Sequence, residues 1–345
     1  MSSIKVGVLR GGPSSQYDVS LNTGAHILKH LGLKEGKYQA HDIFVDRNGI
    51  WHMHGIPRQP HDVISQFDVI VNGLHGHYGE DGKVQHILEQ HGVPFTGSSS
   101  VQSAMGMNKG IAKKIFKENG IKTPYFILVA EPGPNTPHKT ISELAQNIFK
   151  SFPLPAVVKP ISSGSSIGVT IARSMHELEN ALRSVFTHSN TALIEEYIKG
   201  TEATVGVIDG FRGQDLYALP PIEIVPHHTH HPDSWIFDYE NKYGFGGTTA
   251  RAEKRVPGNF SIDIKRELEE IAKKAHDTLG LRHYSRSDLI VHPKRGIYIL
   301  ETNSLPSLTP ESLLPKALEA VGVDMADFLD HIITLAIDKH KREGK

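Results

Sequence analysis

The sequence predicts an α/β protein with more than one domain and an α+β unit in its centre. Short apolar runs that suit buried strands alternate with longer segments whose apolar residues recur at helical spacing. The length of 345 residues suffices for two or three domains of ordinary size.

Residues 1–98 are predicted to form an N-terminal α/β domain. Its first strand, Ile4–Leu9, runs into a glycine turn at Gly11 and Gly12, and a helix follows from about Ser20 to Leu31. The other elements expected here are strands at Ile43–Val45 and Val69–Val71 and a helix at Val84–His91.

Residues 99–197 are predicted to form a smaller α+β unit. Asn108 is placed to cap a helix that ends at Gly120, and Ser174 with Glu177 three residues later forms a capping box at the start of another. Strands are expected at Pro155–Lys159, Ile167–Ile171 and Ala192–Tyr197.

Residues 198–345 are predicted to form the C-terminal unit. A long helix with one apolar face is expected to end at Gly280. The strands expected are Ala203–Ile208, Ile222–Val225 and a final hairpin of Arg286–Val291 with Gly296–Leu300.

The composition narrows the classes of function. The 37 basic and 38 acidic residues nearly balance, which argues against nucleic acid or an anionic membrane as a partner. No apolar run reaches the roughly 20 residues that span a bilayer, and a chain without cysteine has no disulfide and no thiol nucleophile. Because no signal peptide precedes the first strand, the cytoplasm is the expected location.

The predicted final hairpin gathers hard oxygen ligands. Side chains two residues apart on a strand share a face, which groups Arg286 with Asp288 and, just past the paired strand, Glu301 with Asn303. Two carboxylates and an amide suit Mg²⁺, which takes further ligands from water and phosphates. The alternative is an ordinary ion pair at the end of a hairpin.

A loop rich in serine and glycine follows the strand that carries Lys159 and ends at Gly168. Small residues let backbone N–H groups approach phosphate oxygens, and Lys109 is placed to add a second positive charge. The loop does not match a Walker A sequence. The turn at Gly11 and Gly12 lacks the glycine spacing of a dinucleotide site, which disfavours an oxidoreductase. A plain flexible loop and a surface lysine are the alternatives.

A series of short blocks, taken in order, resembles the D-alanine–D-alanine ligases of the ATP-grasp superfamily nearly from end to end. Each block is short, but their common order is specific, and it favours the metal and phosphate interpretations over the plainer alternatives. The blocks are Gly11–Leu21, Leu74–Gly82, Pro94–Ser98, Lys159–Gly168, Tyr239–Tyr243, Arg286–Asp288 and Glu301–Pro306.

The resemblance implies a three-domain ATP-grasp fold with a doubly wound N-terminal domain, ATP between the second and third domains, and a homodimer. It implies that two Mg²⁺ ions, with Mn²⁺ as an alternative, are held by Asp288, Glu301 and Asn303. The residues implied for ATP are Lys109, Lys159, Ser165, Ser166, Glu195, Glu196, Ile198, Glu202 and Lys242. Those implied for the amino acids are Gln16, Val19, His75, Arg286, Ser307, Ser312 and Leu313, and those implied for catalysis are Gln16, Ser165, Tyr243, Arg286 and Ser312.

The implied product is D-alanyl-D-alanine for peptidoglycan precursor synthesis. ATP would phosphorylate the carboxylate of the first D-alanine, while Mg²⁺ and the lysines neutralise the transferring phosphoryl group. The amine of the second D-alanine would then attack, with Arg286 placed to stabilise the oxyanion. Ser165 and Tyr243, on two loops over the site, would bond to each other and exclude water.

Three features depart from the family pattern. Gln16 replaces a glutamate that holds the ammonium of the first D-alanine, a charge-assisted contact worth up to about 1.5–3 kcal/mol, which Glu80 is placed to supply in part. Ser307 replaces a glycine whose N–H helps to bind the oxyanion, and a serine N–H serves equally where φ is negative. The segment before the Tyr239–Tyr243 block is longer than in the family and carries His227–His231. A run of histidines of this kind more often belongs to a solvated loop than to a metal site.

Three other functions stay open at this point. One is a ligase with a different first substrate, because Gln16 lacks the family's charge. The second is a D-alanine–D-lactate type ligase, which Tyr243 disfavours, since that variant usually has another residue there. The third is a non-catalytic nucleotide-binding regulator, and the complete set of Asp288, Glu301, Asn303, Lys109 and Lys159 argues against it.

Overall fold

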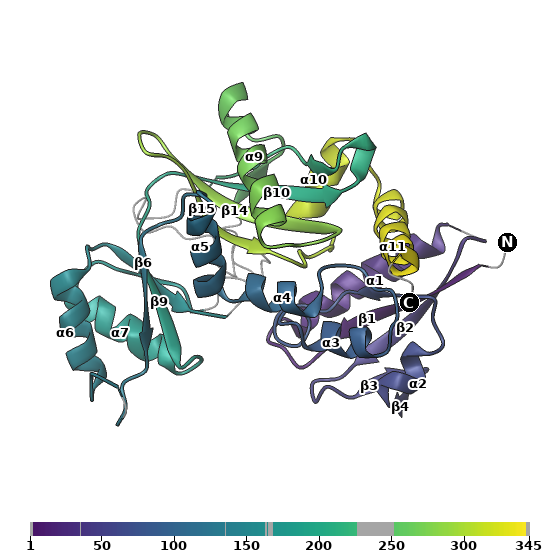
Figure 1. Ribbon diagram of the computed structural model, residues 1–345, viewed down its shortest axis with the longest axis horizontal. Coiled ribbons are helices and arrows are strands. Elements are labelled where there is room, and N and C mark those ends of the chain that lie inside the picture. Colours follow the sequence, from purple (N-terminus) through teal and green to yellow (C-terminus); the bar gives the residue numbers. More distant parts are fainter. Residues whose placement is uncertain are drawn as a thin grey trace.

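The computed structural model describes residues 3–34, 36–134, 136–162, 164, 168–225 and 252–342. They form three β-sheets of five, four and six strands. In Figure 1 the N-terminal unit lies on the right, the small central unit on the left, and the C-terminal sheet above and between them. This arrangement confirms the α/β class and the α+β character of the centre.

The N-terminal sheet has the strand order β4-β3-β2-β1-β5. Strand β1 runs parallel to β2 and β5, and its side chains alternate between two buried faces. Val6 and Val8 pack with Ile27 of helix α1 on one face, while Leu9 packs on the other face with helices α2 and α3. The elements are β1 (Ile4–Gly11), α1 (Tyr17–Gly32), β2 (Tyr38–Val45), β3 (Trp51–Met53), β4 (Ile56–Arg58), α2 (Pro60–Ile64), β5 (Val69–Asn72) and α3 (Lys83–Gln90).

Helix α1 begins at Tyr17, one turn earlier than the apolar pattern predicts. Gln16 is therefore its N-cap residue, and the N–H of Gln16 donates to Ser14 Oγ at 2.9 Å. Asp18 lies in the first turn, where a carboxylate is favoured by the helix dipole. Because the first turn is polar, apolar spacing alone does not predict this helix start.

The central unit is an antiparallel sheet in the order β6-β9-β7-β8 with two helices. Both predicted caps are confirmed: Asn108 Oδ1 accepts from the N–H of Ile111 at 3.0 Å, and Ser174 Oγ accepts from that of Glu177 at 3.2 Å. The Glu177 carboxylate reaches the N–H of Arg173, one residue before the N-cap. The elements are β6 (Phe126–Ala130), α6 (Ile141–Ser151), β7 (Ala156–Pro160), β8 (Thr170–Ala172), α7 (Met175–Phe186) and β9 (Thr191–Glu196).

The C-terminal sheet has the order β13-β12-β10-β14-β15, with β11 paired to β10. Helix α5 lies within residues 99–197, which were predicted to form the central unit. Its Ala112 and Phe116 nevertheless pack into the core of the C-terminal sheet. The domain boundaries after residues 98 and 197 stay a prediction. The elements are α4 (Ser100–Met107), α5 (Lys109–Glu118), β10 (Thr201–Asp209), η1 (Phe211–Gly213), β11 (Leu216–Ala218), β12 (Ile222–Val225), β13 (Glu253–Arg255), α9 (Ile262–Thr278), β14 (Tyr284–His292), β15 (Gly296–Asn303), α10 (Leu313–Ala320) and α11 (Met325–Arg342).

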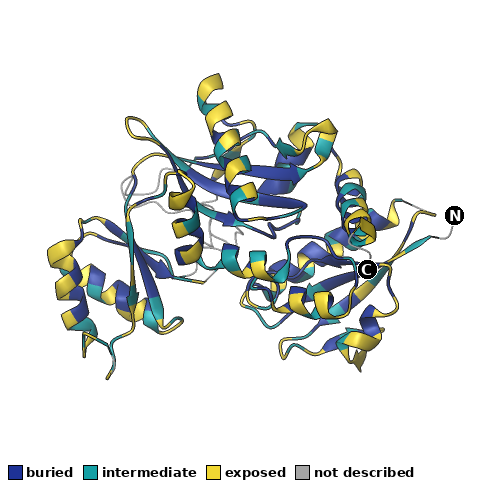
Figure 2. Cartoon of the chain, in the orientation of Figure 1, coloured by how far each residue is buried: buried dark blue, intermediate teal, exposed yellow. Residues whose placement is uncertain are grey.

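The N-terminal and C-terminal units share one apolar core. Ile27 of α1 belongs to the same buried cluster as Phe328 and Ile332 of α11. Figure 2 shows most strand residues inside the sheets buried and the outer faces of the helices exposed. This packing fixes the N-terminal end of α1 relative to the C-terminal sheet, and residues from both units can therefore line one site.

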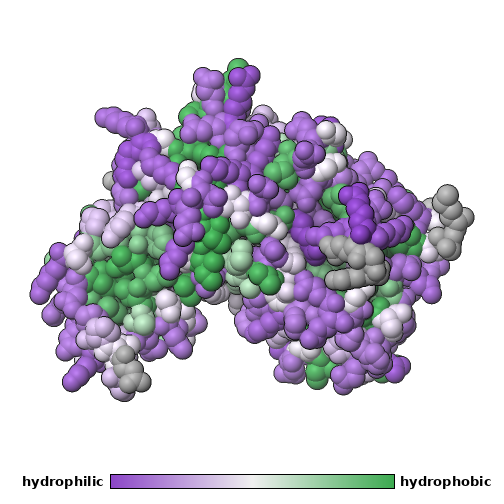
Figure 3. Space-filling model, in the orientation of Figure 1, coloured by the Kyte–Doolittle hydropathy of each residue, from purple (hydrophilic) through white to green (hydrophobic). Residues whose placement is uncertain are grey.

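The face of the molecule in Figure 3 is largely hydrophilic. Figure 3 shows hydrophobic side chains gathered mainly over the central unit, on the left of the view. Among the helices that the structure describes, none combines the length and the apolarity that a membrane span requires.

His283 forms a further link between the N-terminal and C-terminal units. It precedes β14, has a φ of 66°, and its Nδ1 accepts a hydrogen bond from the N–H of Gly97 at 3.0 Å. Only 3% of the residue is exposed, and this burial lowers the pKa of His283 from 6.5 to about 3. The unfolded chain binds a proton here below pH 6.5, whereas the folded chain does so only near pH 3, so stability falls as the pH falls through this window.

His283→Asn is expected to weaken this acid destabilisation, because asparagine does not titrate and tolerates a positive φ. Between about pH 6.5 and pH 4 the wild-type chain should lose roughly 2–3 kcal/mol more of its free energy of unfolding than the variant. Urea unfolding at both pH values measures the difference. Equal losses in the two proteins would show that this histidine is not buried in its neutral form.

Candidate active site

The hairpin of β14 and β15 brings the predicted metal ligands together. Asp288 lies opposite Glu301 and Arg286 opposite Asn303 in the strand register. Arg286 donates two hydrogen bonds of 2.9 Å to the Asp288 carboxylate, and Asn303 Nδ2 lies 3.5 Å from the same group. The predicted shared face is therefore present. Strand β15 extends to Asn303, so Glu301 and Asn303 lie within the strand and not past its end.

Two further side chains contact the carboxylates. Thr204 of β10 donates to Asp288 Oδ1 at 2.8 Å, and Lys109 Nζ lies 3.1 Å from Glu301 Oε2. Two carboxylates and an amide oxygen are hard donors that fit Mg²⁺. No group of three His, Cys, Asp or Glu side chains in the described ranges could hold a metal ion. The other ligands of an ion at this hairpin would therefore come from Asn303, water or phosphate.

A buried cluster of charges lies where α5, β7 and β9 meet. The carboxylate of Glu195 forms ion pairs with Lys159 and with Lys113, the latter at 2.8 Å, and Lys113 also donates to Thr123 Oγ1 at 2.7 Å. Burial lowers the pKa of Lys113 to about 8. Burial opposes ionisation of Glu195, but the charges of Lys113 and Lys159 outweigh it and hold the pKa of that carboxyl below its usual value.

Lys113 is a member of this cluster that the sequence analysis missed. It lies one helical turn after Lys109 on α5, and this spacing of four residues is the signal that could have found it. Among the described residues, Lys109, Lys113 and Lys159 place three positive charges beside the carboxylates of Glu195 and Glu301. Such a group of lysines suits a polyphosphate.

The end of β9 and the start of β10 carry the other residues implied for the nucleotide. The Glu196 carboxylate accepts hydrogen bonds of 2.6 and 3.1 Å from Arg295 at the surface, so a nucleotide contact from this residue would come from its backbone. Ile198 is buried, and Glu202 lies near the start of β10, paired with Ile290 of β14.

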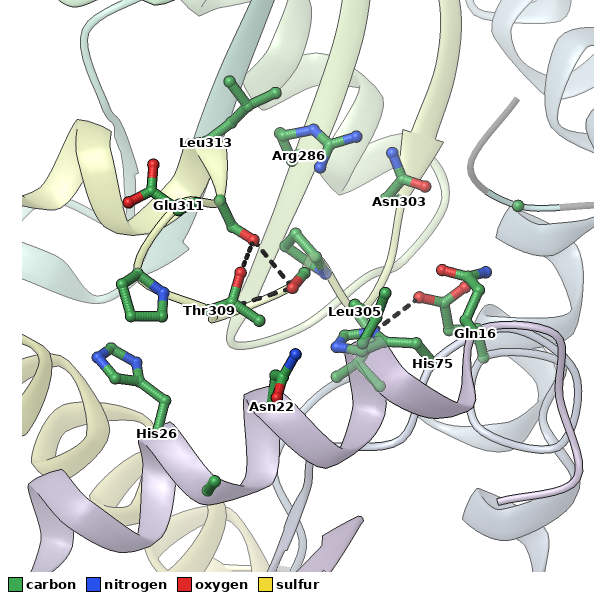
Figure 4. Close-up of a pocket in the computed structure, with 18 of the residues that line it drawn as sticks. Gln16, Asn22, His26, His75, Arg286, Asn303, Leu305, Thr309, Glu311 and Leu313 are labelled. Atoms are coloured by element: carbon green, nitrogen blue, oxygen red, sulfur yellow. Dashed lines mark hydrogen bonds and ion pairs between the residues drawn. The ribbon is translucent and has the colours of Figure 1, made fainter. Parts of the chain in front are cut away.

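A cavity of about 570 Å³ lies between the start of α1, the hairpin and the start of α10 (Figure 4). Its lining includes Glu301 and Asn303 of the hairpin, and Glu80 from the N-terminal unit. The structure also brings into this one cavity every residue that the sequence analysis assigned to the amino acids, namely Gln16, Val19, His75, Arg286, Ser307, Ser312 and Leu313.

Gln16 and Glu80 both line this cavity, and a Cβ at Gly164 would lie 3.7 Å from Glu80 Oε2 as well as close to the Gln16 amide. Gly76 and Gly164 pack around the Gln16 amide so closely that a Cβ at either would lie 2.9 or 2.6 Å from Gln16 Nε2. The Glu80 carboxylate lies 3.3 Å from His75 Nδ1. Glu80 thus brings a negative charge to the part of the cavity where Gln16 supplies none.

A second departure from the family pattern, Ser307, has an ordinary backbone conformation. Among the residues with described placement, the non-glycine positions with positive φ are His54, Tyr78, Arg212 and His283. Ser307 is not one of them, so its φ is negative. Its N–H can therefore take the place of the glycine N–H at this position. The structure does not describe Ser165, Ser166, Lys242, Tyr243 or His227–His231, and the predictions for these residues lie outside it.

Two family models match the chain. Residues 115–334 match the D-ala D-ala ligase C-terminus, and residues 55–98 match the D-ala D-ala ligase N-terminus. The C-terminal match alone covers more than half of the sequence.

Relatives and solved structures agree with these matches. The chain is 35% identical over 346 residues to a D-alanine–D-alanine ligase of Geobacter sulfurreducens, covering 100% of this chain and 98% of that protein. It is 36% identical over 341 residues to a D-alanine–D-alanine ligase of Halalkalibacterium halodurans, covering 97% and 100%. The D-alanine–D-alanine ligase of Bacillus anthracis complexed with ATP superposes with a TM-score of 0.77 at 30% identity, covering 99% and 100%. The chain belongs to the D-alanine–D-alanine ligase family.

Proposed function

We propose that this protein is the ATP-dependent and Mg²⁺-dependent ligase that joins two D-alanine molecules into D-alanyl-D-alanine for peptidoglycan precursor synthesis. The observation that supports this most strongly is the single cavity that joins Gln16, Arg286 and Ser312 to the carboxylate and amide of Glu301 and Asn303. A carboxylate that enters this cavity meets a guanidinium and lies beside the ligands of an ion. We place the reaction in the cytoplasm, where ATP is available, and we expect a homodimer.

Each group of residues has its own task in this proposal. Bound Mg²⁺ would neutralise charge on the phosphoryl group that ATP transfers to the first carboxylate. Lys109 and Lys159 hold the phosphates through fixed positive charges. Arg286 stabilises the oxyanion that forms when the second amine attacks the acyl phosphate. Ser312, with Leu313, holds the carboxylate of the second D-alanine.

A screen of amino acid pairs tests the proposal against its alternatives. The protein is incubated with ATP, Mg²⁺ and pairs of amino acids, among them D-alanine alone and D-alanine with D-lactate, and phosphate release and product mass are measured. D-alanine alone should give the highest rate and the mass of the dipeptide. A higher rate with another first substrate, or no product from any pair, would contradict the assignment.

Gln16→Glu is expected to lower the apparent KM for the first D-alanine by up to about tenfold, or about 1.4 kcal/mol, because a second carboxylate joins Glu80 beside the ammonium. The KM for ATP should not change, since Gln16 lies in the amino acid cavity. Initial rates at varied D-alanine and ATP concentrations measure both constants. Loss of activity would indicate that the native first substrate is not an ordinary D-amino acid.

A further inference from the structure

A second cavity, of about 330 Å³, lies at the junction of the N-terminal and C-terminal units. Its walls come from the end of α3, the segment between α3 and α4, the residues just before β14 and the last two turns of α11. Among the residues that the structure describes, this cavity and the amino acid cavity have no lining residue in common. It is therefore separate from the candidate active site.

Basic side chains from both of the C-terminal segments line this second cavity. Lys339 and His340 come from α11, and Arg282 comes from the residues before β14. The Arg282 guanidinium lies over the ring of Phe95, 4.8 Å from its centroid, and Arg282 Nε donates to the carbonyl of Gly97 at 2.9 Å. These contacts hold the guanidinium against the N-terminal unit, so its charge has a fixed place in the wall.

Glu89 is the acidic residue of the described lining, and its carboxylate is already engaged. It accepts hydrogen bonds from the N–H of Ser100 at 2.9 Å and from the hydroxyl of Ser100 at 2.5 Å. Arg282 and Lys339 outnumber it, so the charged lining is positive on balance. Ser99, the N-cap residue of α4, also lines the cavity, and the positive end of this helix adds to the same field.

His283 contributes a buried N–H group to this lining. The N–H of Gly97 can only donate, so His283 Nδ1 accepts and the one proton of the neutral ring is on Nε2. Within the described ranges no acceptor reaches this buried nitrogen, although a buried N–H without an acceptor is unfavourable. Besides burial, the nearby charges of Arg282 and Lys339 lower the pKa of His283. The unused donor and the positive charges therefore lie close together.

We propose that this cavity is a binding site for a tetrahedral oxyanion of the phosphate class, which accepts a hydrogen bond from His283 Nε2 and lies beside Arg282 and Lys339. Such an anion has several acceptor oxygens, so it satisfies the buried N–H and also balances the positive charges, whereas a water molecule does only the first. Because the lining comes from both units, a bound anion would stabilise their contact. The inference goes beyond the proposed ligation and uses none of its residues.

Isothermal titration calorimetry with inorganic phosphate tests this site, at constant ionic strength and with a non-hydrolysable ATP analogue and Mg²⁺ occupying the ligase site. The wild type should bind a single phosphate. Lys339→Gln should raise the Kd about tenfold, because a charge-assisted contact is lost. Lys341→Gln removes an exposed lysine of α11 outside the described lining and should change the Kd by less than about twofold, since exposed charges are screened.

Glycerol 3-phosphate in a parallel titration distinguishes the two sources of a phosphate group. Tighter binding of this ester than of inorganic phosphate would identify a phosphate monoester as the ligand, and the reverse order would identify the free ion. Both results support the site. If neither compound binds the wild type, or if the two lysine variants have equal Kd values, the inference is overturned.

The ring nitrogens of His283 report on the proposed hydrogen bond directly. In protein labelled with ¹⁵N-histidine, the Nε2 signal that disappears in His283→Asn belongs to this residue. Added phosphate should shift this signal in the wild type, and Lys339→Gln should need more phosphate for the same shift. Binding of phosphate with an unmoved His283 signal would contradict the assignment of the anion to this cavity.

Discussion

Glu301→Gln is expected to lower the rate of ligation by at least about 100-fold, because it removes one of the two carboxylates that would hold Mg²⁺ at the hairpin and so several kcal/mol of charge stabilisation. The glutamine is nearly the same size, so the paired strands β14 and β15 should stay intact. Turnover at increasing Mg²⁺ concentrations measures the effect, and the variant should need more Mg²⁺ than the wild type.

Glu319→Gln is a matched control for this substitution. Glu319 lies exposed on α10 and does not line the cavity, so the same change of charge there should leave turnover unchanged. Thermal unfolding of both variants checks that the fold is retained. Near-normal turnover of Glu301→Gln at moderate Mg²⁺ would contradict the assignment of the hairpin as the metal site.

Glu80→Gln is expected to raise the KM for the first D-alanine by about 10- to 100-fold, because a charge-assisted hydrogen bond is worth about 1.5–3 kcal/mol. The structure places this carboxylate in the cavity wall that carries Gln16, where the family's own glutamate is missing. The KM for ATP should change far less, because Lys109 and Lys159, which would hold its phosphates, keep their ion pairs with Glu301 and Glu195.

The double variant Gln16→Glu with Glu80→Gln separates this charge effect from other roles of Glu80. It returns one carboxylate to the wall at the other position, and it should recover most of the lost affinity for the first D-alanine. If Glu80→Gln has no effect, the ammonium does not depend on this charge. If the double variant stays as weak as the single one, Glu80 acts through its contact with His75 and not through the substrate.

The elements that local sequence determines were predictable. Asn108 and Ser174 cap their helices as expected, because a cap depends on residues three positions apart. The shared face of Arg286 and Asp288 follows from strand alternation in the same way. The start of α1 at Tyr17 was not predicted, since its first turn is polar and gives no apolar signal.

The contacts that link distant segments were beyond the sequence patterns. Thr23 meets Ser307 across 284 residues, and no spacing rule relates two such positions. Lys113 was missed for a different reason, because a lysine on a helix is usually exposed, and only packing against Glu195 shows that this one is buried. The resemblance to a family supplied the residues of the cavity, but not the hydrogen bonds among them.

The most direct test of the ligase assignment follows an oxygen atom through the reaction. D-alanine labelled with ¹⁸O in its carboxylate is incubated with the protein, ATP and Mg²⁺, and the released phosphate and the dipeptide are analysed by mass spectrometry. In an acyl phosphate route, a carboxylate oxygen of the first D-alanine bonds to the γ-phosphorus and leaves with the phosphate when the second amine attacks. We predict D-alanyl-D-alanine together with one ¹⁸O atom in each phosphate formed. Dipeptide with unlabelled phosphate would contradict the acyl phosphate, and labelled phosphate without dipeptide would contradict the ligation.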